Sequence, residues 1–270
     1  MAQVFVYLMG FVVLVIGIPA AFFMRWDWLN PAFPDSSGVF QEYLNRFAWG
    51  VVFTLVILVF SVVVGLLLAI PVGLVQVTGP RWLASIARGY CSVMRGTPLL
   101  IQLWLAYYGL GEFLPLIPRD IWNSQIGFGV SIADILRSGW PYALMVFTLN
   151  FAGYEGEVMR GAFASVPKGE LEAARSFGMA RSQVLGRIWL PRALQQVLPT
   201  LSGEVVLQLK STPLAATVTI LDVFSVSNKV RQDLFLIYEP LLLLGLIYVS
   251  LTALIVLGFR YLERLTPQRK

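Results

Sequence analysis

Hydrophobic and polar positions alternate along this chain in long blocks. Several uncharged apolar runs approach the ~20 residues that an α-helix needs to cross a ~30 Å hydrocarbon core, and short polar segments separate them. The pattern predicts an all-α fold, a polytopic membrane helix bundle of about six transmembrane helices. The expected spans are residues 1–24, 47–79, 98–114, 139–153, 193–220 and 234–259.

The first apolar run, Met1–Met24, has two interpretations. It is uncharged and long enough to span a membrane. A cleaved signal peptide is the alternative, but such peptides usually begin with a positively charged region, which residues 1–7 lack. We therefore expect residues 1–46 to form an extra N-terminal transmembrane helix and an extracytoplasmic loop.

Composition supports a membrane protein and limits its chemistry. Of the 270 residues, 57% are hydrophobic and 13% are charged. The net charge of +5 comes from basic residues dispersed over the loops, which does not favour nucleic-acid binding. Histidine is absent, Cys91 is the single cysteine, and the sequence contains no phosphate-binding P-loop. We expect no catalytic residue, no metal site and no cofactor bound by this chain.

The distribution of Lys and Arg predicts the orientation. Loops expected on one side of the membrane hold 13 of these residues, and loops on the other side hold 6. Basic residues are enriched in cytoplasmic loops. The richer side, which includes residues 160–192 and the tail at 261–270, is therefore expected to be cytoplasmic, as are both termini.

Residues 165–191 are polar, although they lie between two strongly apolar segments, so they must sit in water at a membrane surface. Ser165 can cap a short helix, and Pro167 suits its first turn. Gly178 can end that helix, because glycine adopts a left-handed conformation at low cost. A second short helix is expected to follow, until Pro191 breaks it.

The first of these short helices is expected to be amphipathic, because Leu171, Ala174 and Phe177 recur at helical spacing. A helix of ~10 residues is marginal alone in water, so it needs a surface to pack against. Docking into a groove on a partner protein would meet that need. Ala173 and Ala174 would allow a close approach, and Glu172 could meet a basic residue. The alternative is a solvated connecting loop.

The fifth expected span carries a polar stripe. Glu204 lies ~15 Å from the expected membrane entry, close to the midplane. At 100° per residue, Thr200, Glu204, Gln208 and Ser211 share one face, whereas Lys210 points well away. Ionisable groups inside a membrane are costly and usually face the bundle interior or a wet cavity. The stripe is therefore a candidate substrate path.

Two further readings concern the same span. The dipeptide Thr212–Pro213 is expected to break the helix and to free backbone carbonyls that could line the same cavity. Alternatively, Glu204 has only a packing role and is neutralised by a partner such as Lys210 of a neighbouring copy. If Glu204 is ionised and faces the path, it would attract a cationic amino acid.

Three other polar features are weaker candidates. The Arg95–Pro98 sequence is expected to form a helix-start turn, with Arg95 anchored at the lipid interface. Glu157 and Arg160 are three residues apart and are expected to form a local ion pair. Glu239, near the start of the last span, could be a path residue or an interfacial one.

Residues 165–191, which we call the hairpin, resemble a known sequence motif. The residues that carry the resemblance are Glu172, Ala173, Ala174, Gly178, Ile188, Leu190 and Pro191. Their types and spacing are similar to those of the cytoplasmic EAA loop of ABC-importer permease subunits. The resemblance implies that residues 154–191 form a cytoplasmic coupling loop, whose coupling helix fits into the ATPase subunit.

Most of the chain resembles the polar amino-acid branch of these permeases, in particular the histidine, arginine and opine permeases. The segments that carry this are residues 90–102, 148–161, 166–174 and 204–215. The resemblance implies a five-helix type I importer domain at 47–260 and a cytoplasmic tail at 261–270. Glu170, Gly203 and Pro213 depart from the usual residues of the branch, and the last two flank the expected substrate region.

The function implied by the resemblance is ATP-driven import of a polar, and in particular a basic, amino acid or an opine by alternating access. The implied partners are an ATPase dimer that binds ATP and Mg²⁺, a second permease subunit that is homologous or identical, and an extracytoplasmic binding protein. The implied location is the bacterial inner membrane.

Two other classes of function remain as alternatives. A secondary carrier or channel is disfavoured because no internal repeat is detectable and the multiple buried acids or histidines of a proton relay are missing. A membrane enzyme, such as an intramembrane protease, is disfavoured because no Ser–Lys dyad, paired Asp or metal cluster occurs at helical spacing within the spans.

Overall fold

The computed structural model describes residues 37–110, 112, 125–127 and 130–265. The expected first helix at 1–24 and the end of the tail lie outside the described residues, so the proposed division at residues 46 and 260 stays a prediction.

The described chain is helical apart from one short antiparallel pair of strands, β1 (Gln125–Gly127) and β2 (Val130–Ser131). This confirms the expected all-α fold class. The helical elements are α3 (Ser37–Thr78), α4 (Arg81–Gly96), α5 (Leu99–Trp104), η3 (Leu105–Gly109), α7 (Ile132–Arg137), α8 (Trp140–Ser165), α9 (Lys168–Ser176), α10 (Arg181–Val184), η5 (Leu185–Trp189), α11 (Leu190–Ser211), η6 (Thr212–Val218), α12 (Val223–Leu234) and α13 (Tyr238–Leu265).

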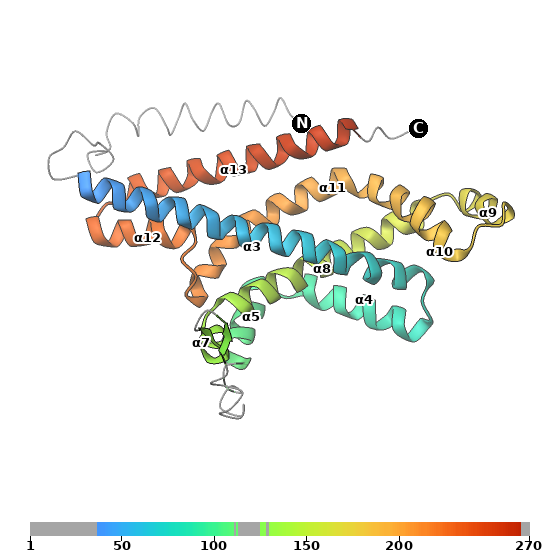
Figure 1. The fold of residues 1–270 in the computed structure, drawn as a ribbon, viewed down its shortest axis with the longest axis horizontal. Helices are drawn as coiled ribbons and strands as arrows, with labels where there is room; N and C mark the ends of the chain where they lie inside the picture. Colours follow the sequence, from blue (N-terminus) through green and yellow to red (C-terminus); the bar gives the residue numbers. More distant parts are fainter. Residues whose placement is uncertain (1–36, 111, 113–124, 128–129, 266–270) are drawn as a thin grey trace.

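Four long helices, α3, α8, α11 and α13, form an elongated bundle, and α4 packs against α3 and α8 (Figure 1). The small helix α9 lies at one end of this bundle, which we call the hairpin end. The turn from α3 to α4 lies at the same end, and α13 runs toward it. Helix α12 lies at the opposite end.

The main core lies between α3, α8, α11 and α13, and Phe151, Met159 and Val205 are among its buried residues. Helices α3 and α8 approach closely: a Cβ atom added to Gly73 would lie 2.6 Å from Cβ of Met159. Ser61 and Thr54, on the same helix, are fully buried. Small residues at such positions let helix backbones pack tightly in membranes.

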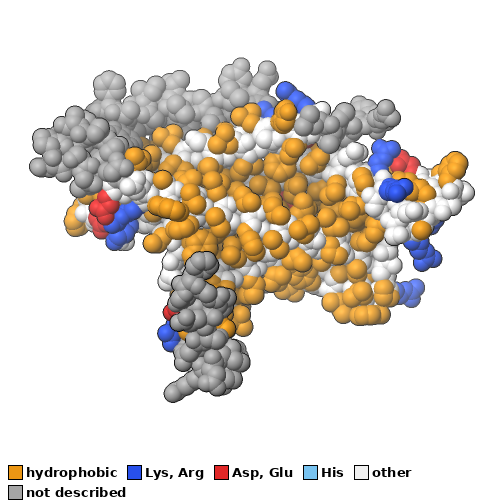
Figure 2. Space-filling model, viewed as in Figure 1, with side chains coloured by type: hydrophobic (Ala, Val, Ile, Leu, Met, Phe, Trp, Pro, Cys, Tyr) orange, Lys and Arg blue, Asp and Glu red, His pale blue; other side chains and the backbone are white. Residues whose placement is uncertain are grey.

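Two helices in the described part of the chain are long and apolar enough to cross a membrane, at Glu42–Thr78 and Tyr238–Arg264. The run from Arg181 to Leu234 adds a third if its two halves, bent by 55°, form one span. Helix α8 carries the polar residues Glu155, Glu157 and Arg160, which lower its hydropathy. Apolar side chains cover the middle of the visible face, and Lys and Arg lie mainly near its ends (Figure 2).

Three segments expected to be loops are helical. Residues 37–46 extend α3, residues 81–95 belong to α4, and most of 221–233 forms α12. Helix α4 is amphipathic and buries Ala84 and Cys91. Helix α12 is capped by Asp222, whose Oδ1 accepts a hydrogen bond of 2.9 Å from the Ser225 N–H. Tertiary packing therefore stabilises helices in segments whose charge content suggested loops.

Candidate functional site

Helix α9 forms the first half of the polar hairpin at the end of the bundle. Ser165, expected to cap it, is instead the last residue of α8, and Pro167 directly precedes α9. Leu171 and Ala174 are buried against Val184 and neighbouring apolar side chains of the hairpin. The short helix is therefore held by its own chain, as its amphipathic pattern predicts.

The turn after α9 depends on Gly178, which has a φ of +80°. Its N–H donates to the Arg175 carbonyl at 2.9 Å, and the Met179 N–H donates to the Ala174 carbonyl at 3.2 Å. These two bonds form a Schellman motif, in which glycine is favoured because it lacks a Cβ atom. The predicted helix end at Gly178 is confirmed.

The outer face of α9 presents Glu172 and Ala173 to solvent. Phe177 was expected to share the packed face with Leu171 and Ala174, but 89% of it is exposed. Phe177 is the C-cap residue, where the helix has ended, so helical spacing no longer fixes its direction. Ala174 is buried, so it supports α9 and does not contribute to the outer face.

The second half of the hairpin continues into the bundle. Pro191 was expected to break this helix, and that expectation is wrong: α10, η5 and α11 form one helical run to Ser211. The Leu190 N–H bonds to the Leu185 carbonyl five residues back, so the turn before the proline is a wider π-type turn. Such a turn accommodates the proline ring and its missing N–H.

Both remaining motif residues of the hairpin are partly buried. Ile188 packs with the apolar cluster of the hairpin, and Leu190 packs against the main core of the bundle. Pro191 is exposed. The structure thus brings the seven motif residues into one hairpin, but only Glu172, Ala173, Gly178 and Pro191 are at its surface.

Polar contacts attach the hairpin to the bundle. Arg192 Nε of α11 lies 3.2 Å from a carboxylate oxygen of Glu170 on α9. The Trp189 indole N–H donates to the Phe163 carbonyl of α8 at 2.9 Å, and the two rings pack edge to face. A displacement of α9 would therefore act on both α8 and α11.

A cavity of 530 Å³ lies farther along the bundle, between the α4–α5 turn, α8 and α11. Its lining residues are Arg95, Gly96, Thr97, Pro98, Leu99, Asn150, Phe151, Tyr154, Glu204, Leu207, Gln208, Lys210 and Ser211. The lining combines both signs of charge with amide groups and aromatic rings, which suits a small polar ligand.

Three of the four stripe residues line this cavity. Glu204 is partly exposed to it, and it makes no ion pair or hydrogen bond with another described residue. Gln208 is buried and donates to Ser61 Oγ and to the Phe147 carbonyl, each at 3.1 Å, so its amide nitrogen links three helices. Ser211 also lines the cavity, whereas Thr200 is exposed and is not among the lining residues.

Arg95 and Lys210 depart from the expectations for them. Arg95, expected at the lipid interface, lines the cavity, and its guanidinium carbon lies 5.8 Å from the centre of the Tyr154 ring. Lys210 was expected to point well away from the stripe, but it lines the same cavity, near the end of α11. Arg95 and Lys210 therefore line the same cavity as Glu204.

Asn150 is a lining residue that sequence reasoning missed. Its Nδ2 donates to the Met94 carbonyl and to Gln102 Oε1, each at 3.1 Å. These bonds link α8 to the break between α4 and α5, where Pro98 precedes α5 as the expected helix-start turn. A signal was available, because an asparagine inside an apolar span is costly unless it is paired.

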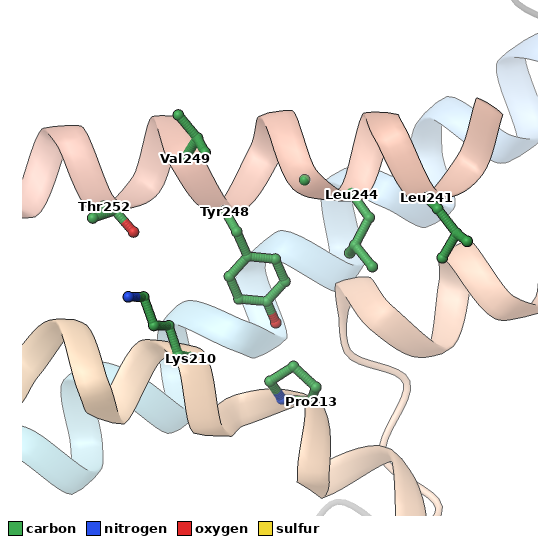
Figure 3. A pocket seen from close by; sticks show the side chains of 8 residues that line it. Lys210, Pro213, Leu241, Leu244, Tyr248, Val249 and Thr252 are labelled. Carbon is green, nitrogen blue, oxygen red and sulfur yellow. The ribbon is translucent and has the colours of Figure 1, made fainter. Parts of the chain in front are cut away.

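A second cavity, of 420 Å³, lies between α11 and α13 and is mostly apolar. Figure 3 shows Tyr248 of α13 pointing toward Pro213, with Lys210 beside it. The Tyr248 hydroxyl lies 3.0 Å from Thr212 Oγ1. The α-helix ends there: η6 begins at Thr212, and Thr219 has a left-handed φ of 68°. The predicted break at Thr212–Pro213 is confirmed.

Three other polar side chains were singled out in the sequence: Arg160, Glu157 and Glu239. Arg160 and Glu157 form the expected local ion pair, with a shortest distance of 2.6 Å. Glu239, in the first turn of α13, is buried. Within the described residues, no group of three or more Cys, Asp or Glu side chains is arranged to hold a metal ion.

Comparisons with known proteins agree with this architecture. The family described as binding-protein-dependent transport system inner membrane component matches residues 61–266. The octopine transport system permease of Rhizobium meliloti is 37% identical over 82% of this chain and 86% of its own length. The arginine ABC transporter permease of Haemophilus influenzae is 32% identical over 84% of this chain and 94% of its own.

Solved structures show the same fold. An amino acid ABC transporter crystallised with histidines superposes with a TM-score of 0.65 at 25% identity, covering 83% of this chain and 95% of that one. The inward-facing MetNI methionine ABC transporter gives 0.63 at 18% identity and supports the fold alone, covering 83% and 98%. This chain therefore belongs to the family of inner-membrane permease components of binding-protein-dependent transport systems, and it is a permease of the amino-acid ABC transporter type.

Proposed function

We propose that this chain carries a cationic amino acid, or an opine-like derivative of one, across the inner membrane in an ATP-driven importer. The main support is the continuous helical run that begins in the hairpin at Arg181 and reaches the Glu204 cavity. The names of the relatives point to the same chemistry, because octopine and arginine each contain a basic group. Glu204, which has no ion-pair partner among the described residues, would bind that group.

The outer face of α9 docks in a groove of a separate ATPase, which binds ATP and Mg²⁺; this chain binds neither. The exposed Glu172, Ala173 and Phe177 suit such a contact, since a large exposed aromatic side chain is a common interface anchor. Closure of the ATPases then moves α9. The Glu170–Arg192 pair and the Trp189–Phe163 contact transmit the movement to α11 and α8.

The transport cycle alternates access to the cavity between the two sides of the membrane. In this proposal the hairpin end and both termini are cytoplasmic, and residues 1–24 span the membrane. A second permease subunit, homologous or identical, completes the pathway. An extracytoplasmic binding protein delivers the substrate at the opposite end. The excess of Lys and Arg in the loops of the hairpin side supports this orientation.

A reconstitution experiment tests the proposal. The permease is co-purified with its partner P-loop ATPase and placed in lipid vesicles. The neighbouring binding protein, loaded in turn with L-arginine, L-histidine or octopine, is then added, and ATP turnover and uptake are measured. The proposal requires at least one cationic ligand to raise both rates. Failure of the ATPase to co-purify, or stimulation by none of these ligands, would contradict it.

A further inference from the structure

Glu155 of α8 is buried without a partner. Its side chain is fully inaccessible to solvent. Neither carboxyl oxygen accepts or donates a hydrogen bond among the described residues. Burying a carboxyl group without a hydrogen-bond partner is costly, because it loses its hydration and gains nothing in return. A residue in this state calls for a ligand, a water molecule or a rearrangement that satisfies it.

The position of Glu155 follows from the pairing of α8 with α11. These helices are antiparallel: the Phe147 carbonyl accepts from Gln208 beside the cavity, and Phe163 contacts Trp189 near the hairpin. Glu155 lies midway between Phe147 and Phe163 along α8. Phe151 and Met159, one turn before and one turn after it, pack in one core cluster with Val205 of α11, so Glu155 lies in this packed contact, between the cavity and the hairpin end.

Glu155 is also the immediate neighbour of the cavity. It is one turn beyond Phe151, which lines the cavity, and it follows Tyr154, which lines it too. Glu204 lines the same cavity from α11, and its neighbour Val205 packs in the core cluster that contains Phe151. From Glu155 toward the hairpin end, the side chains that α8 and α11 bury in the core are apolar, including Met159, Leu201 and Val197.

We propose that Glu155 is the second acidic residue of the substrate path. It is covered in this conformation, and it binds the cationic group of the substrate after Glu204, when the contact between α8 and α11 opens toward the hairpin end. Two neighbouring carboxyl groups disfavour each other's ionised form, and a cation between them favours it. The pair therefore favours a cationic substrate over a neutral one at the step from the cavity to the cytoplasm.

This inference rests on the proposed import function, and the experiment separates the two. Vesicles contain the complete transporter, and the probes are L-arginine, L-histidine and octopine, each loaded on the binding protein. If the wild-type complex takes up none of them, the import function itself fails. If it takes up at least one, that probe is used to compare the wild type with Glu155→Gln.

Glu155→Gln keeps the shape of the side chain and removes its charge. We expect the maximal uptake rate to fall about tenfold, because the substrate loses one charged contact as it moves from the cavity toward the cytoplasm. The concentration of loaded binding protein at half-maximal rate should change less than about twofold, because loading at Glu204 is retained. Glu155→Asp keeps the carboxylate and should restore part of the rate.

A purely structural role predicts a different result. The glutamine variant would then take up the probe at the wild-type rate, or lose uptake together with thermal stability and purification yield. Either outcome overturns the inference. Glu157→Gln is the matched control, two residues along α8, because its carboxylate is already paired with Arg160. An equal loss of uptake in that variant also overturns the assignment, since the effect would then be general to acidic residues on α8.

Discussion

The hairpin and the cavity differ in how their charged side chains are paired. At the hairpin, Glu170 is paired with Arg192, and both are partly exposed to water. At the cavity, Glu204 has no such pair among the described residues, and Glu155 behind it has no hydrogen bond either. Paired charges fix the geometry of a connection, whereas unpaired charges in a membrane interior are available to a ligand. The difference separates a region built to transmit movement from one built to bind.

The largest expected effect concerns the outer face of the hairpin. Phe177→Asp replaces an exposed aromatic side chain with a charge, and as the loss of an interface anchor it should weaken binding of the ATPase about 100-fold. Binding is measured by titrating the ATPase onto the permease in detergent. The control is Ser176→Ala, because the Ser176 hydroxyl is used within α9, on the Glu172 carbonyl. Unchanged affinity of the aspartate variant would exclude Phe177 from the docking face.

The second effect concerns the cavity. Glu204→Gln removes the unpaired charge and should lower uptake of a cationic substrate about tenfold, or by about 1.4 kcal/mol. ATPase co-purification should stay at the wild-type level, because Glu204 is remote from α9. Uptake in vesicles and pull-down yield are the two measurements. Transport at the wild-type rate would show that Glu204 is not part of the substrate path. The view of the cavity as the binding region would then be contradicted.

A third effect isolates the turn of the hairpin. Gly178→Ala places a Cβ atom at a φ of +80°, which should destabilise the turn by about 1 kcal/mol. Hydrogen exchange of the hairpin amides measures this. Gly169→Ala is the matched control, because Gly169 is helical and a Cβ atom there meets no neighbour within 4 Å. That variant should protect α9 slightly, since alanine favours helices. Equal protection in both variants would contradict a special role for Gly178.

The smallest effect is expected for the pair that joins the two halves of the hairpin. Glu170 and Arg192 have 37% and 41% of their side chains exposed, so their coupling energy should be below about 1 kcal/mol. A double-mutant cycle with Glu170→Gln and Arg192→Gln, read by thermal unfolding, measures it. The transport rate is read in parallel. A coupling well above this range would mean that the hairpin is attached more rigidly than its exposure implies.

Local chemistry made some features predictable from the sequence. A glycine after an amphipathic helix predicted the left-handed turn at Gly178, and Thr212–Pro213 predicted the end of α11, because these residue types constrain their own backbone. The polar stripe predicted three cavity residues, since Glu204, Gln208 and Ser211 lie on one face of a regular helix. These predictions depend on spacing within one helix or turn.

Other features depend on contacts between helices or on irregular backbone, and the sequence pattern did not reveal them. The wide turn before Pro191 lets the helix continue, which proline propensity alone argues against. Phe177 lies just past the end of α9, so helical spacing misplaced it. Arg95 reaches the cavity because α4, expected to be a loop, packs against α8. Burial of Glu155 likewise depends on how α8 meets α11.

The continuous helical run from Arg181 to Ser211 can turn a small tilt into a large displacement at its far end. Roughly 30 residues at 1.5 Å each make a rod about 45 Å long, with the hairpin at one end and Glu204 near the other. If the rod pivots as one piece, a tilt of about 5° shifts its far end by about 4 Å, more than the diameter of a water molecule. A small movement of the water-exposed hairpin is therefore enough to open a passage within the membrane.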